Sequence, residues 1–296
     1  GAAVTGTAMM TGLNPGVGQD MAVGGGTDAT NYMAAFRLHY EDRSGLKVPS
    51  SSPSPRLPDY ARNNAASNLP QYSGSMFGIV SHETGPHRIT ASGYGSLIDR
   101  GAEFADWLQL GSGVDSQGRV VENRVSLAQG FFDVRMESRI SDTADVAADA
   151  LVFMGGPTPR DRIEVGSDLF YVRRRFFYRG VDLEVSGRWR PMPQLALQAS
   201  LSNTTDMEDQ PGTERVLKST GAPATQPARA GQMFILSNTG VQMQAIWSPF
   251  PRRLTITSGL RVDLHTIYGP QLSTRVAAVY QATNELTLKA FYGSAF

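Results

Sequence analysis

Cysteine is missing from this chain of 296 residues. Disulfide scaffolds, thiolate zinc sites and cysteine nucleophiles are therefore excluded. Lysine is nearly missing too, because only Lys47, Lys218 and Lys289 occur among the 27 basic residues. Since 27 acidic residues balance that number, the formal charge is zero, and composition gives no indication of a nucleic-acid partner.

Long apolar runs and helical periodicity are scarce as well. No stretch approaches the roughly 18 apolar residues of a membrane-spanning helix. Charged residues make up 18% of the chain, below the ~25% that is typical of soluble domains. The best helix candidates are Leu97–Leu110 and the alanine-rich Ala144–Leu151. Composition therefore favours β architectures.

Most of the patterned sequence alternates between apolar and polar residues with period two, as strands with one buried face do. In Val181–Arg190 the odd positions carry valine, leucine, glycine and tryptophan, whereas the even positions carry aspartate, glutamate, serine and arginine. Asp133–Ile140, Val241–Trp247 and Leu254–His265 repeat the pattern. Several runs reach the ~9–11 residues of a membrane-crossing strand, beyond the ~5–6 of an ordinary one. We count about 12 or 13 candidate strands.

The connections between these runs alternate in length. The short ones, several with proline at a turn position, are Gly24–Asn31, His82–Arg88, Ser141–Asp145, Pro191–Gln194, Pro249–Arg253 and Ala282–Glu285. The long polar ones are Glu41–Tyr72, Asp99–Arg124 and Ser202–Ala230. Transmembrane barrels have this asymmetry, with short periplasmic turns and long outer loops.

Aromatic residues collect beside the short connections, where a membrane-interface girdle would lie. We expect this girdle to consist of Trp189, Trp247, Phe250, Tyr280 and Phe291. The alternation assigns the opposite face to a wet lumen, lined by Arg188, Arg190, Gln242, Thr257 and Arg261. So polar a lumen needs a wide barrel, because about eight strands leave only a packed interior.

Two alternatives stay open. A soluble β-sandwich also alternates apolar and polar positions, so a soluble β-rich binding module fits the parity alone. The last run, Leu286–Phe296, still alternates where the chain stops, which predicts an incomplete barrel. A complete small passive pore that ends on Phe296 is the other possibility. The fold class expected is an all-β, antiparallel transmembrane barrel of which this chain holds a part.

Chemical motifs are sparse. His82 and His87 share one short connection with Glu83, but a metal site needs three or four convergent ligands, so we expect a solvated turn and no metal. Gly74–Gly78 lacks the spacing of a nucleophile elbow, and no phosphate-cradling glycine loop occurs. We therefore expect no catalytic residue, no enzyme activity and no cofactor.

The run Arg173–Arg179 is the densest basic–aromatic cluster. A functional interpretation is contact with an anion, either lipopolysaccharide phosphate or an anionic ligand, because guanidinium groups match phosphate oxygens. The simpler interpretation, which the alternating arginines and aromatics favour, is a strand that emerges above the membrane.

The final fifth of the chain carries a more specific pattern. Trp247–Pro249 ends one strand, LTITSGLRVD follows at Leu254–Asp263, RVAAVY at Arg275–Tyr280, and LTLKAFYGSAF at Leu286–Phe296. This stretch resembles the middle of the barrel in TonB-dependent outer-membrane receptors. Phe177–Arg190 resembles a further strand and turn of that family more loosely.

The resemblance implies that residues 1–296 are a partial barrel domain, and no plug domain is recognisable. It also implies uptake of a scarce solute, such as a siderophore, haem, cobalamin or a glycan, across the bacterial outer membrane. The partners implied are an extracellular small molecule, outer-membrane lipid and lipopolysaccharide, and the TonB energy-coupling complex through a plug that is missing here. These motifs are strand and turn patterns, so they identify no ligand-binding residue.

Overall fold

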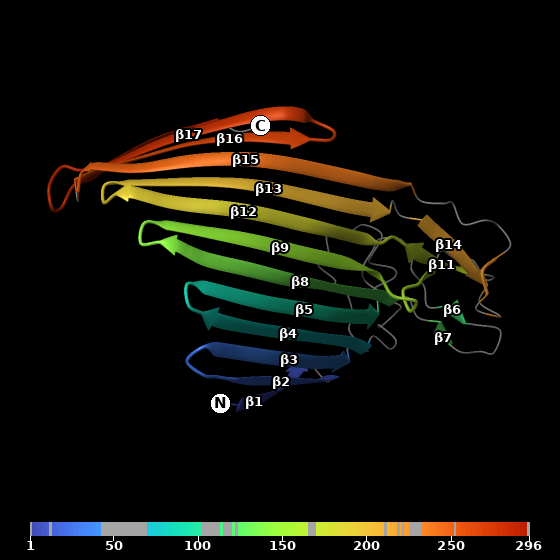
Figure 1. Cartoon of the computed structure of the whole chain (residues 1–296). Helices are drawn as coiled ribbons and strands as arrows, with labels where there is room; N and C mark the ends of the chain where they lie inside the picture. Colours follow the sequence, from blue (N-terminus) through green and yellow to red (C-terminus); the bar gives the residue numbers. More distant parts are fainter. Residues whose placement is uncertain are drawn as a thin grey trace.

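The computed structural model describes residues 2–11, 14–42, 70–101, 113–114, 120–121, 124–164, 170–209, 212–217, 220, 222–224, 232–251 and 253–294. Thirteen strands form one antiparallel sheet in chain order, without crossovers (Figure 1). They are β1 (Ala2–Thr11), β2 (Asn14–Gly26), β3 (Thr30–Asp42), β4 (Pro70–Thr84), β5 (His87–Gly101), β8 (Arg124–Ser141), β9 (Ala144–Pro157), β12 (Tyr178–Met192), β13 (Leu195–Asp209), β15 (Met233–Phe250), β16 (Leu254–His265), β17 (Gly269–Gln281) and β18 (Thr287–Gly293).

Two small sheets lie beyond one end of this wall. One contains β10 (Ile163–Glu164), β11 (Phe170–Arg175) and β14 (Gly212–Leu217), and we call it the loop-end sheet. The other contains β6 (Gly113–Val114) and β7 (Val120–Val121). The described part of the chain contains no helix that is long and apolar enough to span a membrane.

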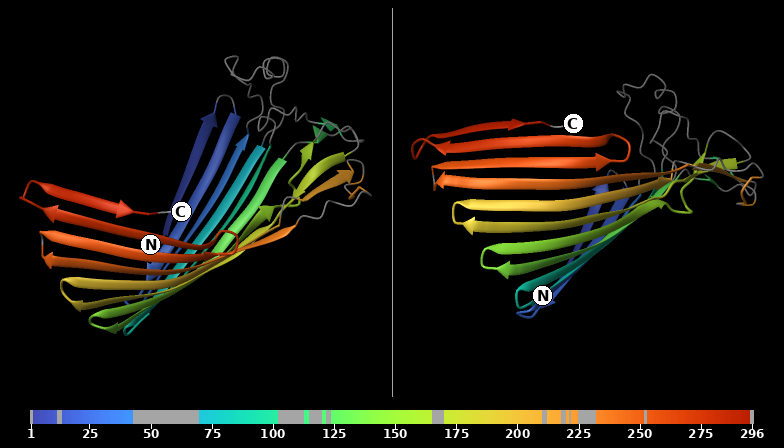
Figure 2. Two further views of the ribbon diagram at one scale, coloured as in Figure 1. Left: turned by 90° about the horizontal axis from the view of Figure 1, so that it is seen from above. Right: turned by 45° about the horizontal axis from the view of Figure 1, so that its top comes forward.

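The main sheet is a curved wall whose first and last strands form opposite edges (Figure 2). Among the described residues, β1 pairs only with β2, and β18 pairs only with β17. The wall is therefore open, as predicted for part of a barrel, and it is not the closed sheet of a complete small pore.

The wall is one layer thick, so it has almost no apolar core. Val216 in the loop-end sheet is the one apolar side chain classed as buried within the described residues. Large apolar side chains of the main sheet are exposed, for example Val185 at 54% and Trp247 at 47%. A soluble sandwich covers such side chains with a second sheet. The described strands instead form one continuous thirteen-stranded sheet in chain order, which contradicts the two packed sheets of the sandwich alternative.

Connection lengths alternate as expected from β3 to β16, but the β1–β2 and β16–β17 connections, which should be long ones, are short as well. Six tight connections (β2–β3, β4–β5, β8–β9, β12–β13, β15–β16 and β17–β18) lie at one end of the wall, and β3, β5, β9 and β13 end at the other, where the long connections begin (Figure 1). Gly85 in the β4–β5 turn has φ +56°, a conformation that glycine adopts without strain. Ser202–Asp209 belongs to β13 rather than to a loop, because it pairs with β15. The long β9–β12 connection was not anticipated.

Neither helix candidate is helical where the structure describes it. Ala144–Leu151 lies in β9, which pairs with β8 and β12 over its length. Two hydrogen-bonded neighbours override the modest helical preference of alanine. Leu97–Gly101 ends β5, and the rest of Leu97–Leu110 lies outside the described residues.

Candidate functional site: the polar face and the loop-end sheet

Strand register sorts the side chains of the wall onto two faces, because directly opposed residues point to the same side. Val185 lies opposite Ala148 and Leu201, on what we call the apolar face. Its neighbour Glu184 lies opposite Asp149 and Ser202, on what we call the polar face. The same parity continues across β15, β16 and β17.

Four of the five residues expected to line a lumen share the polar face. Gln242 and Arg261 lie directly opposite each other on β15 and β16, and Thr257 lies opposite Ile246 on the same strand pair. Arg188 lies opposite Asp145 and Gln198.

Arg190 is the fifth, and it follows an irregularity in the register between Trp189 and Met192. Its backbone N–H donates a hydrogen bond to the carbonyl of Thr143 at 2.7 Å. The backbone of Arg190 is therefore hydrogen-bonded to the β8–β9 turn, outside the regularly paired part of β12 that assigns side chains to the polar face.

The expected girdle residues divide between the faces. Trp189, Trp247, Phe250 and Tyr280 lie on the apolar face, opposite Leu197, Ile256, Leu254 and Leu254 respectively. Phe291 lies opposite Ala277, on the polar face, and is 90% exposed. Leu288 lies opposite Tyr280 and therefore shares the apolar face with it. Phe291 is three residues further along β18, and because successive side chains of a strand alternate between faces, it points to the polar face.

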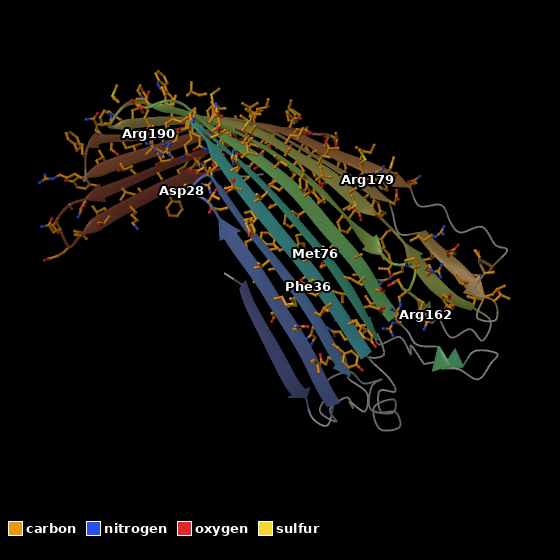
Figure 3. The ribbon with its side chains drawn as sticks, turned by 60° about the horizontal axis from the view of Figure 1, so that its bottom comes forward. Asp28, Phe36, Met76, Arg162, Arg179 and Arg190 are labelled. Carbon is orange, nitrogen blue, oxygen red and sulfur yellow. The ribbon has the colours of Figure 1, made fainter. Side chains whose placement is uncertain are left out.

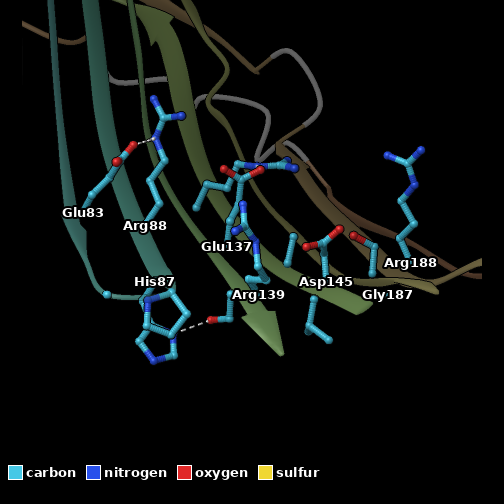
Figure 4. Close-up of a pocket in the computed structure, with 15 residues that line it drawn as sticks. Glu83, His87, Arg88, Glu137, Arg139, Asp145, Gly187 and Arg188 are labelled. Atoms are coloured by element: carbon cyan, nitrogen blue, oxygen red, sulfur yellow. Dashed lines mark hydrogen bonds and ion pairs between the residues drawn. The ribbon is translucent and has the colours of Figure 1, made fainter. Parts of the chain in front are cut away.

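A charged groove lies on the polar face beside the tight turns of β4–β5 and β8–β9 (Figure 4). Arg88 Nε lies 3.6 Å from Glu83, and Arg135 Nε lies 3.1 Å from Glu137. Arg135 also reaches Asp149 at 3.6 Å. Charges of both signs thus alternate along the groove, a surface that suits a polar partner of mixed charge.

A second polar cluster on this face surrounds Arg261, towards the long connections. Its guanidinium donates to both carboxylate oxygens of Asp263 at 2.7 Å. Asn238 donates to the same carboxylate at 3.0 Å. Gly240 leaves room for this pair, since a Cβ there would lie 2.8 Å from Arg261 Nη2 and 2.9 Å from Asp263 Oδ1.

Buried ion pairs hold the loop-end sheet against the wall. Asp161, with no exposed surface, accepts hydrogen bonds from Arg174 Nη2 at 2.6 Å and Nε at 2.9 Å. The same carboxylate accepts from the backbone N–H of Ser126 at 3.1 Å. This hydrogen bonding raises the pKa of Arg174 from its ordinary value. Nearby, Arg124 Nε donates to buried Asp99 at 2.7 Å.

The arginine run is divided by these contacts. Arg173 and Arg175 both pair with Glu214, at 3.7 and 3.2 Å, and Arg174 pairs with Asp161. Arg174 thus has a carboxylate of its own, whereas Arg173 and Arg175 share one. Each of the three arginines has an acidic partner within the protein, which supports the simpler interpretation for this part of the run. Asp161 and Glu214 were not predicted from the sequence. Both lie outside the alternating runs, and no motif around them indicates that their side chains would be buried against arginine.

The histidines of the β4–β5 region have protein partners. His82 shares a hydrogen bond with Thr30 Oγ1 at 2.8 Å, and His87 shares one with Ser138 Oγ at 2.9 Å. Across the described ranges, no group of three histidine or acidic side chains is arranged to hold a metal ion.

No protein-family model and no curated protein sequence matches this chain. Solved structures do match. The ferric enterobactin receptor PfeA of Pseudomonas aeruginosa superposes with a TM-score of 0.64 at 11% identity, over 99% of this chain and 43% of the receptor chain. The unliganded ferric citrate transporter FecA gives 0.63 at 11%, over 98% and 43%. The RagAB peptide importer in its open-open state gives 0.61 at 11%, over 95% and 36%.

The chain thus spans less than half of each of these chains. In all three cases the match covers nearly the whole of this chain. Identity of 11% shows the fold alone. The chain therefore has the fold of a barrel segment of the TonB-dependent outer-membrane receptors, as its final strands predicted.

Proposed function

We propose that this chain is the transmembrane wall segment of an outer-membrane receptor that imports a scarce solute. The observation that carries the proposal is the open, single-layer sheet of thirteen strands with one exposed apolar face. In water such a face is unfavourable, whereas lipid covers it at no cost. Residues outside 1–296 would supply the remaining strands and the plug.

In this proposal the apolar face contacts lipid and the polar face lines the lumen. Trp189, Trp247, Phe250 and Tyr280 then lie at the periplasmic interface, and the long connections lie outside the cell. The charged groove and Arg188, Gln242, Thr257 and Arg261 would face the plug and the passing solute. Phe291 is not part of the proposed girdle, since its side chain lies on the polar face.

The solute belongs to one of a few classes. The similar structures are named for ferric enterobactin, ferric citrate and peptides. We propose uptake of a ferric siderophore, haem, cobalamin, a glycan or a peptide, driven through the plug by the TonB complex of the inner membrane.

Uptake assays in cells test this function. A strain with the intact gene and a deletion strain are supplied with each labelled solute class in turn. An energised receptor accumulates one class, and accumulation stops when the proton-motive force is dissipated or the TonB complex is deleted. Uptake that continues without energy would instead identify a passive pore.

A further inference from the structure

Four aromatic side chains cross the polar face of the wall in a single line. Each lies on its own strand, from β4 to β9, and is directly opposite the next in the strand register. We call this set the aromatic row, and it consists of Phe77, Tyr94, Phe131 and Phe153. The last of these is four residues from Asp149, which lies on the polar face, and side chains an even number of residues apart share a face. Met76, the neighbour of Phe77, points to the apolar face with Phe36 opposite it (Figure 3).

The aromatic row is continuous and long enough for an extended ligand. The rings of Tyr94 and Phe131 are stacked, with their centroids 5.6 Å apart and an angle of 26° between their planes. Because neighbouring strands are about 4.8 Å apart, the row is about 14 Å long between its first and last strands. At the β9 end the ring of Phe153 lies over Gly180 of β12, where an added Cβ would collide with it.

The row leads from the outer end of the wall to its middle. Phe153 is four residues from Pro157, where β9 ends at the level of the long connections. Phe77 is seven residues from either end of β4, so it lies at mid-height. Beside Phe77, the small side chain of Ala35 leaves a hollow of about 290 Å³. A ligand that enters from the outer end therefore meets Phe153 first and can follow the row to this hollow.

Polar side chains flank the row on both sides. Directly opposed residues of the polar face, one step towards the outer end from the rings, are Ser75, Ser96 and Gln129. Tyr178 Oη donates to Gln129 Oε1 at 3.1 Å, which leaves the NH2 group of this amide for a ligand. On the other side of the row, Ser92 lies opposite Asp133. Aromatic ring faces are thus bordered by hydroxyl, amide and carboxylate groups.

The charges around the row disfavour an anionic solute. Asp133 lies two residues from the row on β8, and Asp206 lies on β13, beyond Gly180 at the end of the row. Arg37 and Arg135 lie near the row on the same face, and each already pairs with an acid. The carboxylates would repel an anion, whereas a neutral solute is not repelled.

We propose that the aromatic row is a binding lane for a neutral glycan, which makes a glycan the imported solute. This inference rests on the proposed function, because it needs the polar face to line the lumen of a receptor. The C–H groups of a sugar ring pack on the negative face of an aromatic ring, and sugar hydroxyls exchange hydrogen bonds with hydroxyl, amide and carboxylate groups. A line of rings binds successive sugar units of one chain, so the row suits an oligosaccharide better than a single sugar.

The test uses the intact gene product, purified in a detergent without sugar groups, on an array of neutral oligosaccharides of glucose, galactose, mannose and xylose. The affinity of the oligosaccharide that binds best is then measured by titration calorimetry. Phe131→Leu and Phe153→Leu keep an apolar side chain but remove the ring, so each should weaken binding about threefold to tenfold. Tyr94→Phe keeps the ring and should change the affinity much less. Phe132→Leu, on the apolar face of β8, is the matched control and should bind as the parent does.

Two outcomes would overturn the proposal. One is that no neutral oligosaccharide on the array binds. The other is equal glycan affinity of Phe131→Leu and Phe132→Leu, which is expected if the row packs against the plug instead. Uptake measured in parallel separates this inference from the proposed function. Energised uptake of a solute that is not a glycan refutes the binding lane alone, whereas glycan uptake that continues without energy refutes the receptor and leaves the lane in place.

Discussion

Asp161 and Arg174 form a two-point ion pair, with Oδ1 2.6 Å from Nη2 and Oδ2 2.9 Å from Nε. The pair joins the connection after β9 to β11, so it fixes the loop-end sheet to the wall. Removing one member of a buried pair leaves the other charge uncompensated and costs about 3–5 kcal/mol.

Asp161→Asn should therefore release β11 and β14 from the wall without unfolding the main sheet. Hydrogen exchange followed by mass spectrometry checks this, since amides of Phe170–Arg175 and Gly212–Leu217 should exchange faster while those of β12 do not change. Arg175→Gln is the matched control, because the Arg175 side chain is 63% exposed and surface ion pairs contribute little. Equal exchange in the two variants would show that the ion pair does not hold the sheet.

The assignment of faces predicts a contrast between adjacent positions of β12. Val185→Arg should destabilise the membrane-inserted protein by about 2–4 kcal/mol, because it places a charge in lipid near the bilayer midplane. Glu184→Arg should cost much less, since it faces water on the polar side. Urea unfolding of the protein folded in lipid vesicles measures both. Similar losses at the two positions would mean that the faces are assigned wrongly.

Gly240 should be intolerant of a methyl group. A Cβ at this position would lie within 3.0 Å of both Arg261 Nη2 and Asp263 Oδ1, so Gly240→Ala should displace the ion pair and cost roughly 1–3 kcal/mol. Gly78→Ala provides the control, because nothing lies within 4 Å of the added carbon. Unfolding in vesicles compares the two. If Gly240→Ala were as stable as Gly78→Ala, the Arg261 cluster would have no rigid geometry.

The strands were predictable because one face of each strand is apolar and the turns carry proline or glycine. Val181–Arg190 and Leu254–His265 lie within β12 and β16 as their alternation indicated. Ala144–Leu151 was ambiguous because its alanines fit the helical period of 3.6 residues as well as the strand period of two. Hydrogen bonding to β8 and β12, its two neighbours in the sheet, makes this segment a strand. The loop-end sheet could not be predicted, since β10, β11 and β14 are short, and β11 and β14 pair across a long stretch of sequence that includes two strands of the wall.

The sequence predicted which face of the sheet most of the candidate site residues occupy, but not which side chains they contact. Alternation placed Arg188 and Arg261 on one side, whereas the pairing of Arg261 with Asp263 and the space left by Gly240 depend on neighbouring strands. Phe291 was assigned by its nearness to a turn, and register moved it to the polar face. For the same reason the pairing of Arg173, Arg174 and Arg175 with two acids, Glu214 and Asp161, could not be predicted from the run Arg173–Arg179 itself.

The two ends of the wall should differ in accessibility from outside the cell. Residues 1–296 contain no cysteine, so each single substitution provides one labelling site within them, and the unsubstituted protein gives the background. Thr220→Cys, in the long β14–β15 connection, should react with an impermeant maleimide in whole cells. Pro193→Cys and Thr283→Cys, in tight turns, should react only after the outer membrane is disrupted. Labelling of the turn variants in intact cells would reverse the proposed topology.

The open edges of the wall lead to the last prediction. The edge of β1 that faces away from β2, and that of β18 away from β17, have no strand partner among the described residues. In hydrocarbon each unsatisfied N–H or C=O group costs several kcal/mol, so open edges are not tolerated there. Residues 1–296 expressed alone should therefore aggregate, or pair their edges with another polypeptide, when they are refolded in detergent.

Gel mobility without heating and conductance in planar bilayers measure this outcome. The control is the intact gene product, which should run as a compact, heat-modifiable species because its barrel closes. Addition of the flanking strands as a separate polypeptide should restore that species if edge pairing is the missing element. A heat-modifiable monomer of residues 1–296 that carries a steady current would contradict the receptor-segment proposal, because it would require β1 and β18 to close on each other.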